Sequence, residues 1–154
     1  MGLFNNIKIL VGDKNNTSHQ AANSNLPTQS TPQKKVLIVE DEELLANALA
    51  LKFTHEGYDV LKAPNGQVGL DMTTANKPNI ILLDLMMPVM DGKIMLHKLR
   101  EMPEFKTLPV IVLTNAGDAD NMRETQFYDN ASAFLIKSNV NPDQIVETAK
   151  KYIV

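Results

Sequence analysis

The sequence predicts an α/β protein in which a parallel β-sheet is covered by helices on both faces. Between residues 34 and 154, five short apolar runs alternate with segments whose apolar residues recur at the spacing of a helix. The apolar runs are nearly continuous, which is typical of strands buried on both faces of a parallel sheet. Because crossovers between parallel strands are right-handed, the simplest arrangement is an open, doubly wound sheet with five strands.

Five segments are expected to form the strands. The first, 35–39, is a short run rich in β-branched residues. The second, 58–63, is less apolar and is expected nearer an edge of the sheet. The remaining three are 79–84, 108–115 and 131–137.

The first helix is expected to begin at Asp41, whose side chain can cap it, and to end at Gly57. Its apolar residues recur at helical spacing, which predicts that they face the core. They are Leu44, Leu45, Ala48, Leu49 and Phe53.

Further helices are expected at 66–76, 93–101 and 118–128. A last helix is expected to start at Asn141, which can act as its cap, with Pro142 in the first turn. The helix at 93–101 carries the apolar residues Ile94, Leu96 and Leu99.

The first 33 residues differ from the rest of the chain. Residues 15–33 are almost entirely small or polar, which predicts a flexible linker before a domain at 34–154. Residues 1–14 form a possible amphipathic segment, whose apolar residues would share one helical face. They are Leu3, Phe4, Ile7, Leu10 and Val11. A mostly disordered tail is favoured over contact with a membrane or a partner groove, although those alternatives and a short strand stay open.

Composition excludes several classes of protein. The net charge of -3 gives no electrostatic support to binding of nucleic acid. The absence of cysteine excludes disulfides and thiolate metal sites, and it agrees with a cytoplasmic location. No apolar stretch approaches the roughly 18–20 residues that a membrane span needs.

Polar side chains follow four of the predicted strands. Glu40 and Asp41 follow the first, Asp84 ends the third, Thr114 lies near the end of the fourth, and Lys137 ends the fifth. Sites in doubly wound sheets form at these carboxyl ends. Clustered carboxylates repel one another, so Lys137 and a Mg²⁺ ion are expected to offset their charge. A carboxylate in such surroundings can act as a nucleophile and become an acyl phosphate.

Four motifs containing these residues carry a resemblance to a known family. They are "VLIVEDEELL", "ILLDLMMPVMDG", "PVIVLTNA" and "FLIK". Residues 34–154 resemble the receiver domain of two-component response regulators, in the CheY-like superfamily, because all four motifs occur in that family's order and spacing. The resemblance implies the flavodoxin-like strand order 2-1-3-4-5.

The resemblance also implies roles for individual residues. Asp84 would accept the phosphoryl group, Thr114 would bind it, and Lys137 would pair with it. Mg²⁺ would be held by Asp41, Asp84 and the backbone carbonyl of Met86, with Glu40 acting largely through water. Phe134 occupies the position of the aromatic switch residue, whose rotation accompanies a shift of Thr114.

Four positions depart from the pattern of the family. Ser138 stands where proline is usual, and we expect the 137–138 peptide bond to be trans. Asn115 stands where a smaller residue is commoner, and we expect it to narrow the access to Asp84. Phe134 replaces a frequent tyrosine, and Glu40 replaces a commoner aspartate.

The function expected from the resemblance is that of a stand-alone phospho-receiver rather than an enzyme. Its partners would be a sensor histidine kinase or histidine phosphotransfer protein, and a downstream protein that reads the surface around 118–128, 131–137 and the last helix. The alternative is a pseudo-receiver that binds proteins without phosphotransfer. A phosphatase of the haloacid dehalogenase type is disfavoured, since Met86 stands where its second aspartate is needed. A flavodoxin-like cofactor binder is disfavoured too, since acidic residues follow the first strand.

Overall fold

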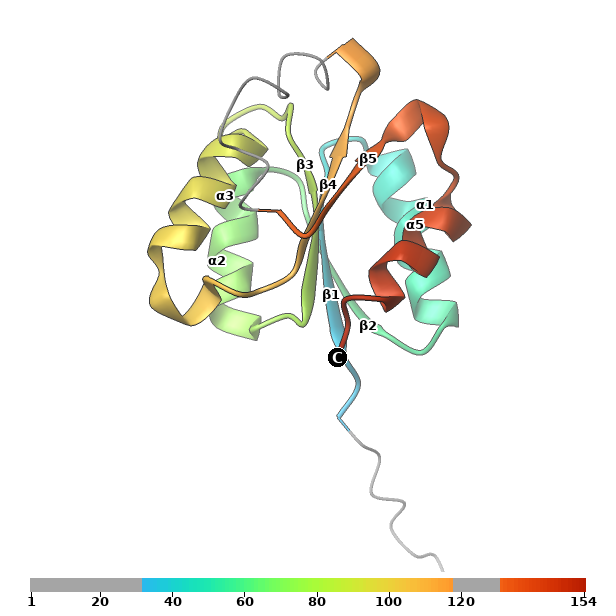
Figure 1. Ribbon diagram of the computed structural model, residues 1–154, viewed down its shortest axis with the longest axis horizontal. Helices are drawn as coiled ribbons and strands as arrows, with labels where there is room; N and C mark the ends of the chain where they lie inside the picture. The colour runs from blue at the N-terminus through green and yellow to red at the C-terminus, as the bar shows by residue number, and fades with distance from the viewer. Residues whose placement is uncertain (1–31, 118–130) are drawn as a thin grey trace, which may run out of the picture.

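The computed structural model describes residues 32–117 and 131–154. Figure 1 shows a central sheet between two layers of helices. The five strands are parallel, in the order β2-β1-β3-β4-β5. Their bounds are β1 Lys35–Val39, β2 Asp59–Ala63, β3 Ile80–Asp84, β4 Val110–Thr114 and β5 Ala133–Ile136. The predicted fold class and strand order are therefore confirmed.

The helices cover both faces of the sheet. On one face lie α1 (Glu43–His55) and α5 (Pro142–Lys150), and on the other lie α2 (Gly66–Asn76) and α3 (Gly92–Glu101) (Figure 1). Two short 3-10 helices complete the described elements, η1 (Pro103–Phe105) and η3 (Lys137–Asn139).

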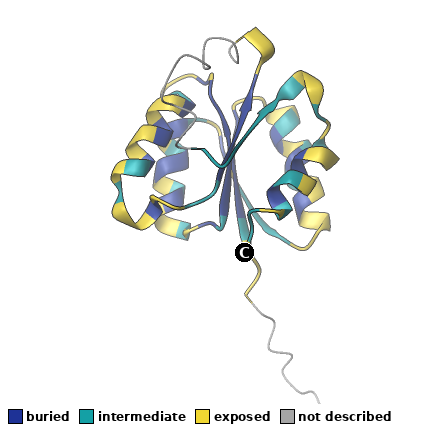
Figure 2. Cartoon of the chain, viewed as in Figure 1, coloured by how far each residue is buried: buried dark blue, intermediate teal, exposed yellow. Residues whose placement is uncertain are grey.

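Each strand contributes side chains to two separate cores because successive side chains point to opposite faces of the sheet. Val36 and Ile38 of β1 pack in the core beneath α1 and α5, whereas Leu37 and Val39 pack in the core beneath α2 and α3. All four are fully buried. Figure 2 shows the resulting buried centre of the sheet with exposed residues on the outer helix faces. This two-sided burial explains why the strand sequences read as continuous apolar runs.

Local sequence signals set most of the helix ends. Gly57, with φ of 86°, follows α1 in the left-handed region that glycine adopts without strain. The Asn65 and Asp91 side chains accept hydrogen bonds from the backbone at the starts of α2 and α3. Asn141 and Gln144 form a capping box at α5, with Pro142 in its first turn, as expected.

Two details of the predicted helices were wrong. Asp41 does not cap α1: the cap position is Glu42, which makes no side-chain cap hydrogen bond. Leu44, expected in the core, is 80% exposed. Leu44 lies at the edge of its apolar pattern, and the periodicity alone does not fix the orientation of the helix.

Other predictions fall outside the described residues. The helix expected at 118–128 and the division of the first 31 residues into an apolar segment and a linker stay predictions. Across 32–117 and 131–154, no helix combines the length and the apolar character needed to cross a bilayer.

Candidate functional site

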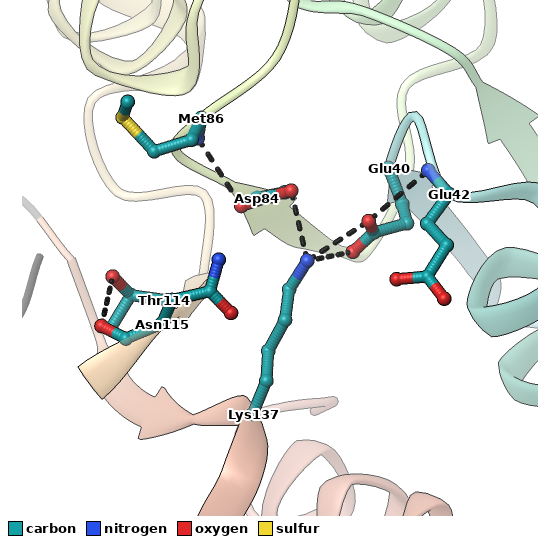
Figure 3. A network of polar contacts seen from close by, with 7 residues as sticks. All are labelled: Glu40, Glu42, Asp84, Met86, Thr114, Asn115 and Lys137. Carbon is teal, nitrogen blue, oxygen red and sulfur yellow. Dashed lines mark hydrogen bonds and ion pairs between the residues drawn. The ribbon is translucent and has the colours of Figure 1, made fainter. Parts of the chain in front are cut away.

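The polar residues at the carboxyl ends of the strands meet in one place. Asp84 is the last residue of β3, and Glu40 follows β1, its neighbour in the sheet. Both carboxylates are buried. Lys137 was expected to end the fifth strand, but β5 ends one residue earlier and Lys137 is the first residue of η3; its side chain reaches across to the two carboxylates (Figure 3).

Lys137 holds the two buried carboxylates together. Its Nζ donates hydrogen bonds to Oδ2 of Asp84 and to Oε1 of Glu40, each at 2.9 Å. Burial lowers the pKa of Lys137, but the hydrogen bonds and charges of Asp84 and Glu40 raise it by more. The net direction is upward, so Lys137 stays an ammonium that offsets the repulsion between the two acids.

The surroundings of Glu40 disfavour the charged form of its carboxyl group. Burial raises its pKa to about 7, and the nearby charge of Asp84 adds to this, while Lys137 and the backbone N–H of Glu42 act against it. Oε1 accepts hydrogen bonds from Lys137 and from the Glu42 N–H at 3.3 Å. Oε2 is buried and lies 2.8 Å from Nζ, but within the described residues it accepts no hydrogen bond.

The three acids are close enough to share a cation. One carboxylate oxygen from each of Glu40, Asp41 and Asp84 lies within 4.8 Å of the others. The unsatisfied Oε2 of Glu40 offers a further acceptor, and oxygen ligands of this kind suit Mg²⁺. The donor set therefore fits a divalent cation. A cleft of about 290 Å³ lies alongside, lined by Glu40, Asp41, Glu43, Ala46, Lys62, Ala63 and Pro64.

The loop after β3 fixes the Asp84 carboxylate. The backbone N–H of Met86 donates to Oδ1 at 3.2 Å, while the Met86 side chain is half exposed. The N–H of Gly92 donates to the carbonyl of Leu85 at 2.9 Å, which brings the start of α3 against the end of β3. A Cβ at position 92 would lie 2.1 Å from the Asp84 carbonyl oxygen, so this approach requires glycine.

Thr114 lies beside the carboxylate group on β4 but does not join its hydrogen bonds. It is buried, and its hydroxyl donates to the carbonyl of Asn115 at 3.4 Å. Figure 3 shows this contact on the side of Thr114 that points away from Asp84. Asn115 is exposed, and its side-chain amide is turned toward the site (Figure 3). Phe134, in β5, is partly buried against the core beneath α2 and α3.

The structure thus brings Glu40, Asp41, Asp84 and Lys137 together, as the strand-end pattern predicted. The direct pairing of Lys137 with Glu40 was not predicted, because sequence does not show which acids lie within reach of a lysine. The tight contact of Gly92 was missed as well, although its position in the Asp-Gly pair after β3 was a usable signal.

The chemistry available to this arrangement is that of an oriented carboxylate beside a cation. Asp84 is held in a fixed orientation by Lys137 and the Met86 N–H, with cationic charge at one oxygen. Such a group can attack an electrophile that carries negative charge, provided that the charge is offset as it arrives.

Comparisons with known proteins agree with this arrangement. Sporulation initiation phosphotransferase F of Bacillus subtilis (strain 168) is 32% identical over 120 residues, covering 78% of this chain and 94% of that protein. The response regulator PleD of Caulobacter vibrioides is 39% identical over 103 residues, which are 67% of this chain and 22% of that protein.

Solved structures give the same result. A putative response regulator from Chloroflexus aurantiacus superimposes with a TM-score of 0.70 at 30% identity, covering 79% of this chain and 98% of that one. The response regulator TrrA from Thermotoga maritima, in complex with Mg²⁺-BeF, superimposes with a TM-score of 0.67 at 27% identity, covering 78% and 99%.

Residues 36–150 match the family described as the response regulator receiver domain, and they include all of the acids and the lysine of the site. The predicted resemblance is confirmed, and the chain belongs to the response regulator receiver domain family.

Proposed function

We propose that the protein receives a phosphoryl group on Asp84 from a sensor histidine kinase or a histidine phosphotransfer protein. The observation that carries this proposal is the 2.9 Å contact of Lys137 with a buried strand-end aspartate. Burying Asp84 beside a second acid contributes little to the stability of the fold, because desolvation offsets the attraction to Lys137. The arrangement is therefore better explained by binding of a phosphoryl group, whose negative charge the ammonium would offset.

The transfer needs one bond to form and one to break. A carboxylate oxygen of Asp84 attacks the phosphorus of the donor phosphohistidine and forms a P–O bond. The P–N bond breaks, and its electron pair stays on the imidazole of the donor. After the transfer, the negative charge lies on the phosphoryl oxygens instead of on the Asp84 carboxylate. Lys137 is already placed to donate a hydrogen bond to one of these oxygens.

Mg²⁺ is the cofactor that fits the acidic group. Glu40, Asp41 and Asp84 would hold it, together with the backbone carbonyl of Met86, whose role is carried over from the family. When bound, the ion supplies positive charge that stabilises the oxygens of the transferred phosphoryl group. The Mg²⁺-BeF complex of TrrA, a similar protein, supports this assignment.

The phosphoryl group would then alter the surface that partners read. A phosphorylated Asp84 presents new acceptor oxygens, and the Thr114 hydroxyl, whose contact with the Asn115 carbonyl is a long 3.4 Å, can turn to donate to them. Movement of Thr114 would make room for Phe134 to move inward. A downstream protein would read the change on β5, α5 and the segment 118–128.

The proposed role is that of a signalling domain. The name of the Bacillus relative, a phosphotransferase, supports a place in phosphotransfer between proteins. The cytoplasmic location expected from the cysteine-free composition stays a prediction, as does the trans geometry before Ser138.

Intact-mass measurement after incubation with acetyl phosphate tests the proposal. We expect a gain of one phosphoryl group that requires Mg²⁺ and is absent in Asp84→Asn. A matched control is Asp71→Asn, because Asp71 is an exposed acid on α2, away from the site. Absence of the gain both with acetyl phosphate and with phosphorylated histidine donors would reject phosphotransfer and favour the pseudo-receiver.

A further inference from the structure

The outer face of α1 carries large apolar side chains that the domain does not cover. Leu44 is 80% exposed and Leu51 is 71% exposed. They are seven residues apart, which is close to two helical turns, so they lie on one face. Ala48 lies between them and is partly buried. Leu44, Ala48 and Leu51 are called the α1 stripe here.

The α1 stripe points away from the rest of the domain. The buried residues of α1 are Ala46, Leu49 and Phe53, on the opposite side of the helix. Among the described residues, α1 packs on β1, β2 and α5, all of which meet that buried side. The two aligned leucines form an apolar strip, and contiguous exposed apolar surface is found where another segment or protein binds.

The chain enters the domain at the end of this same helix. Gln33 donates from its side-chain amide to the carbonyl of Gly57 at 3.2 Å, and Gly57 follows the last turn of α1. The Asp59 N–H donates to the carbonyl of Lys34 at 3.0 Å. Whatever precedes residue 32 is therefore tethered beside the C-terminal end of α1.

The length of the tether matches the length of the helix. Residues 15–32 make up most of the predicted linker and contain no Asp, Glu, Lys or Arg, and a linker of that length and composition is expected to span about 24 Å on average. A helix of the length of α1 is about 20 Å long. The tether allows residues 1–14 to reach any turn of α1, and short flexible tethers give effective concentrations on the order of millimolar.

The chemistry of residues 1–14 complements the α1 stripe. In a helix, the five apolar residues of this segment would share one face. Lys8, Lys14 and Asp13 give this segment a net charge of +1; since the whole chain carries -3, the rest carries -4. Exposed acids, Glu42 and Glu43, lie at the start of α1 beside Leu44. The apolar residues of the segment therefore match the α1 stripe, and its positive charge matches the acids at the start of α1.

We infer that residues 1–14 pack in cis along the α1 stripe, with their apolar face against Leu44 and Leu51. The covered surface reaches the site, because Glu43, the neighbour of Leu44, lines the cleft beside Glu40 and Asp41.

Because the chain contains no cysteine, a single introduced cysteine can be labelled at one defined position. A nitroxide is attached to Asn5→Cys, on the polar face of the segment, in the full ¹⁵N-labelled chain. We expect paramagnetic broadening of amide signals concentrated in α1, and its loss in Leu44→Ser/Leu51→Ser. Val89→Ser is the matched control, because Val89 is 87% exposed and lies off α1, so this change leaves the broadening in place.

Three results would overturn the inference. They are broadening spread evenly over the domain, broadening centred on another surface, and equally strong broadening of α1 when spin-labelled ¹⁴N chain is mixed with ¹⁵N chain that carries no spin label. The last result would indicate a second copy as the occupant. Well-dispersed spectra of the double variant show that it is folded, which is expected since both leucines are exposed. Phosphorylation by acetyl phosphate is measured separately, so a failure of phosphotransfer leaves this test intact.

Discussion

Nζ of Lys137 lies 2.9 Å from Oδ2 of Asp84, although the two residues are 53 positions apart in the chain. The lysine follows the edge strand β5, and the aspartate ends the central strand β3. The ammonium spans the carboxyl end of the sheet and also contacts Glu40. A single lysine therefore offsets the charge of both buried acids at this end of the sheet.

Removing that ammonium is expected to destabilise the metal-free protein. In Lys137→Met, Asp84 and Glu40 lose a charged hydrogen-bond donor inside the protein, which costs about 1.5–3 kcal/mol of the free energy of unfolding. Urea unfolding without Mg²⁺ measures the change. Lys151→Met, at an exposed position, serves as the control. Equal stability of the two variants would show that the ammonium contributes nothing to the fold.

The raised pKa of Glu40 predicts how stability depends on pH. Because the folded protein holds this proton up to about pH 7 and the unfolded chain releases it near pH 4.5, the folded state binds more protons between those values. The free energy of unfolding of the metal-free protein should therefore fall as the pH rises through that window, by about 2–4 kcal/mol from this group.

Denaturant unfolding at several pH values checks this, with Glu40→Gln as the matched variant. The variant cannot ionise at position 40, so the decline should be smaller by the share of Glu40. A wild-type curve that rises from pH 4.5 to pH 7 would contradict the assignment.

Asp41 provides a test of the cation site that is separate from folding. It is exposed and does not cap α1, so Asp41→Asn should leave the metal-free stability nearly unchanged. Mg²⁺ should stabilise the wild type because it binds only the folded state, and the variant should lose most of that gain. Thermal unfolding with and without Mg²⁺ measures both effects. Glu42→Gln, one position further on, should keep the full response, and an equal loss there would point to general charge screening.

Gly92 is expected to tolerate no side chain. In Gly92→Ala the new Cβ would lie 2.1 Å from the Asp84 carbonyl oxygen and 2.9 Å from the Leu85 Cα, both backbone atoms. The loop must move, at a cost of about 1–3 kcal/mol or more. Gly117→Ala is the control, since a Cβ there meets nothing within 4 Å. Unchanged stability of Gly92→Ala would mean that α3 does not start against β3 as described.

Val89 stores strain that glycine should release. Its φ is 71°, and the N–H of Met90 donates to the carbonyl of Pro88 at 3.0 Å, which makes a tight three-residue turn. Positive φ is unfavourable for a β-branched residue, and the exposed side chain gains little from packing. Val89→Gly should therefore raise the free energy of unfolding by about 1 kcal/mol. A lower melting temperature in the variant would be the opposite result.

The sequence predicted the fold well because the apolar runs of the strands indicate that both faces of the sheet are covered. Within the predicted strand 79–84, residues 80–83 are apolar at every position, which is typical of a strand covered on both faces. The observed β3 begins one residue later than that range, and β5 begins two residues later than predicted. The capping residue Asn141 also predicted the start of α5 correctly, because a cap depends only on hydrogen bonds to nearby backbone groups.

What the sequence did not predict depends on contacts between distant residues. Leu44 fits the apolar repeat of α1, but the orientation of the helix on the sheet leaves it in solvent. Leu51 did not enter the predicted pattern, and its alignment with Leu44 became visible only in the structure. The contact of Lys137 with Glu40 and the closeness of Gly92 to Asp84 are likewise set by how the sheet and the loops assemble.

The central claim is that Asp84 itself forms the acyl phosphate. After phosphorylation with acetyl phosphate and Mg²⁺, borohydride reduction converts the phosphorylated aspartate to homoserine, and peptide mass spectrometry locates it. We predict homoserine at position 84 and an unmodified Asp41. Reduction at another acid, or no reduced residue in a protein that has gained phosphate, would contradict the account.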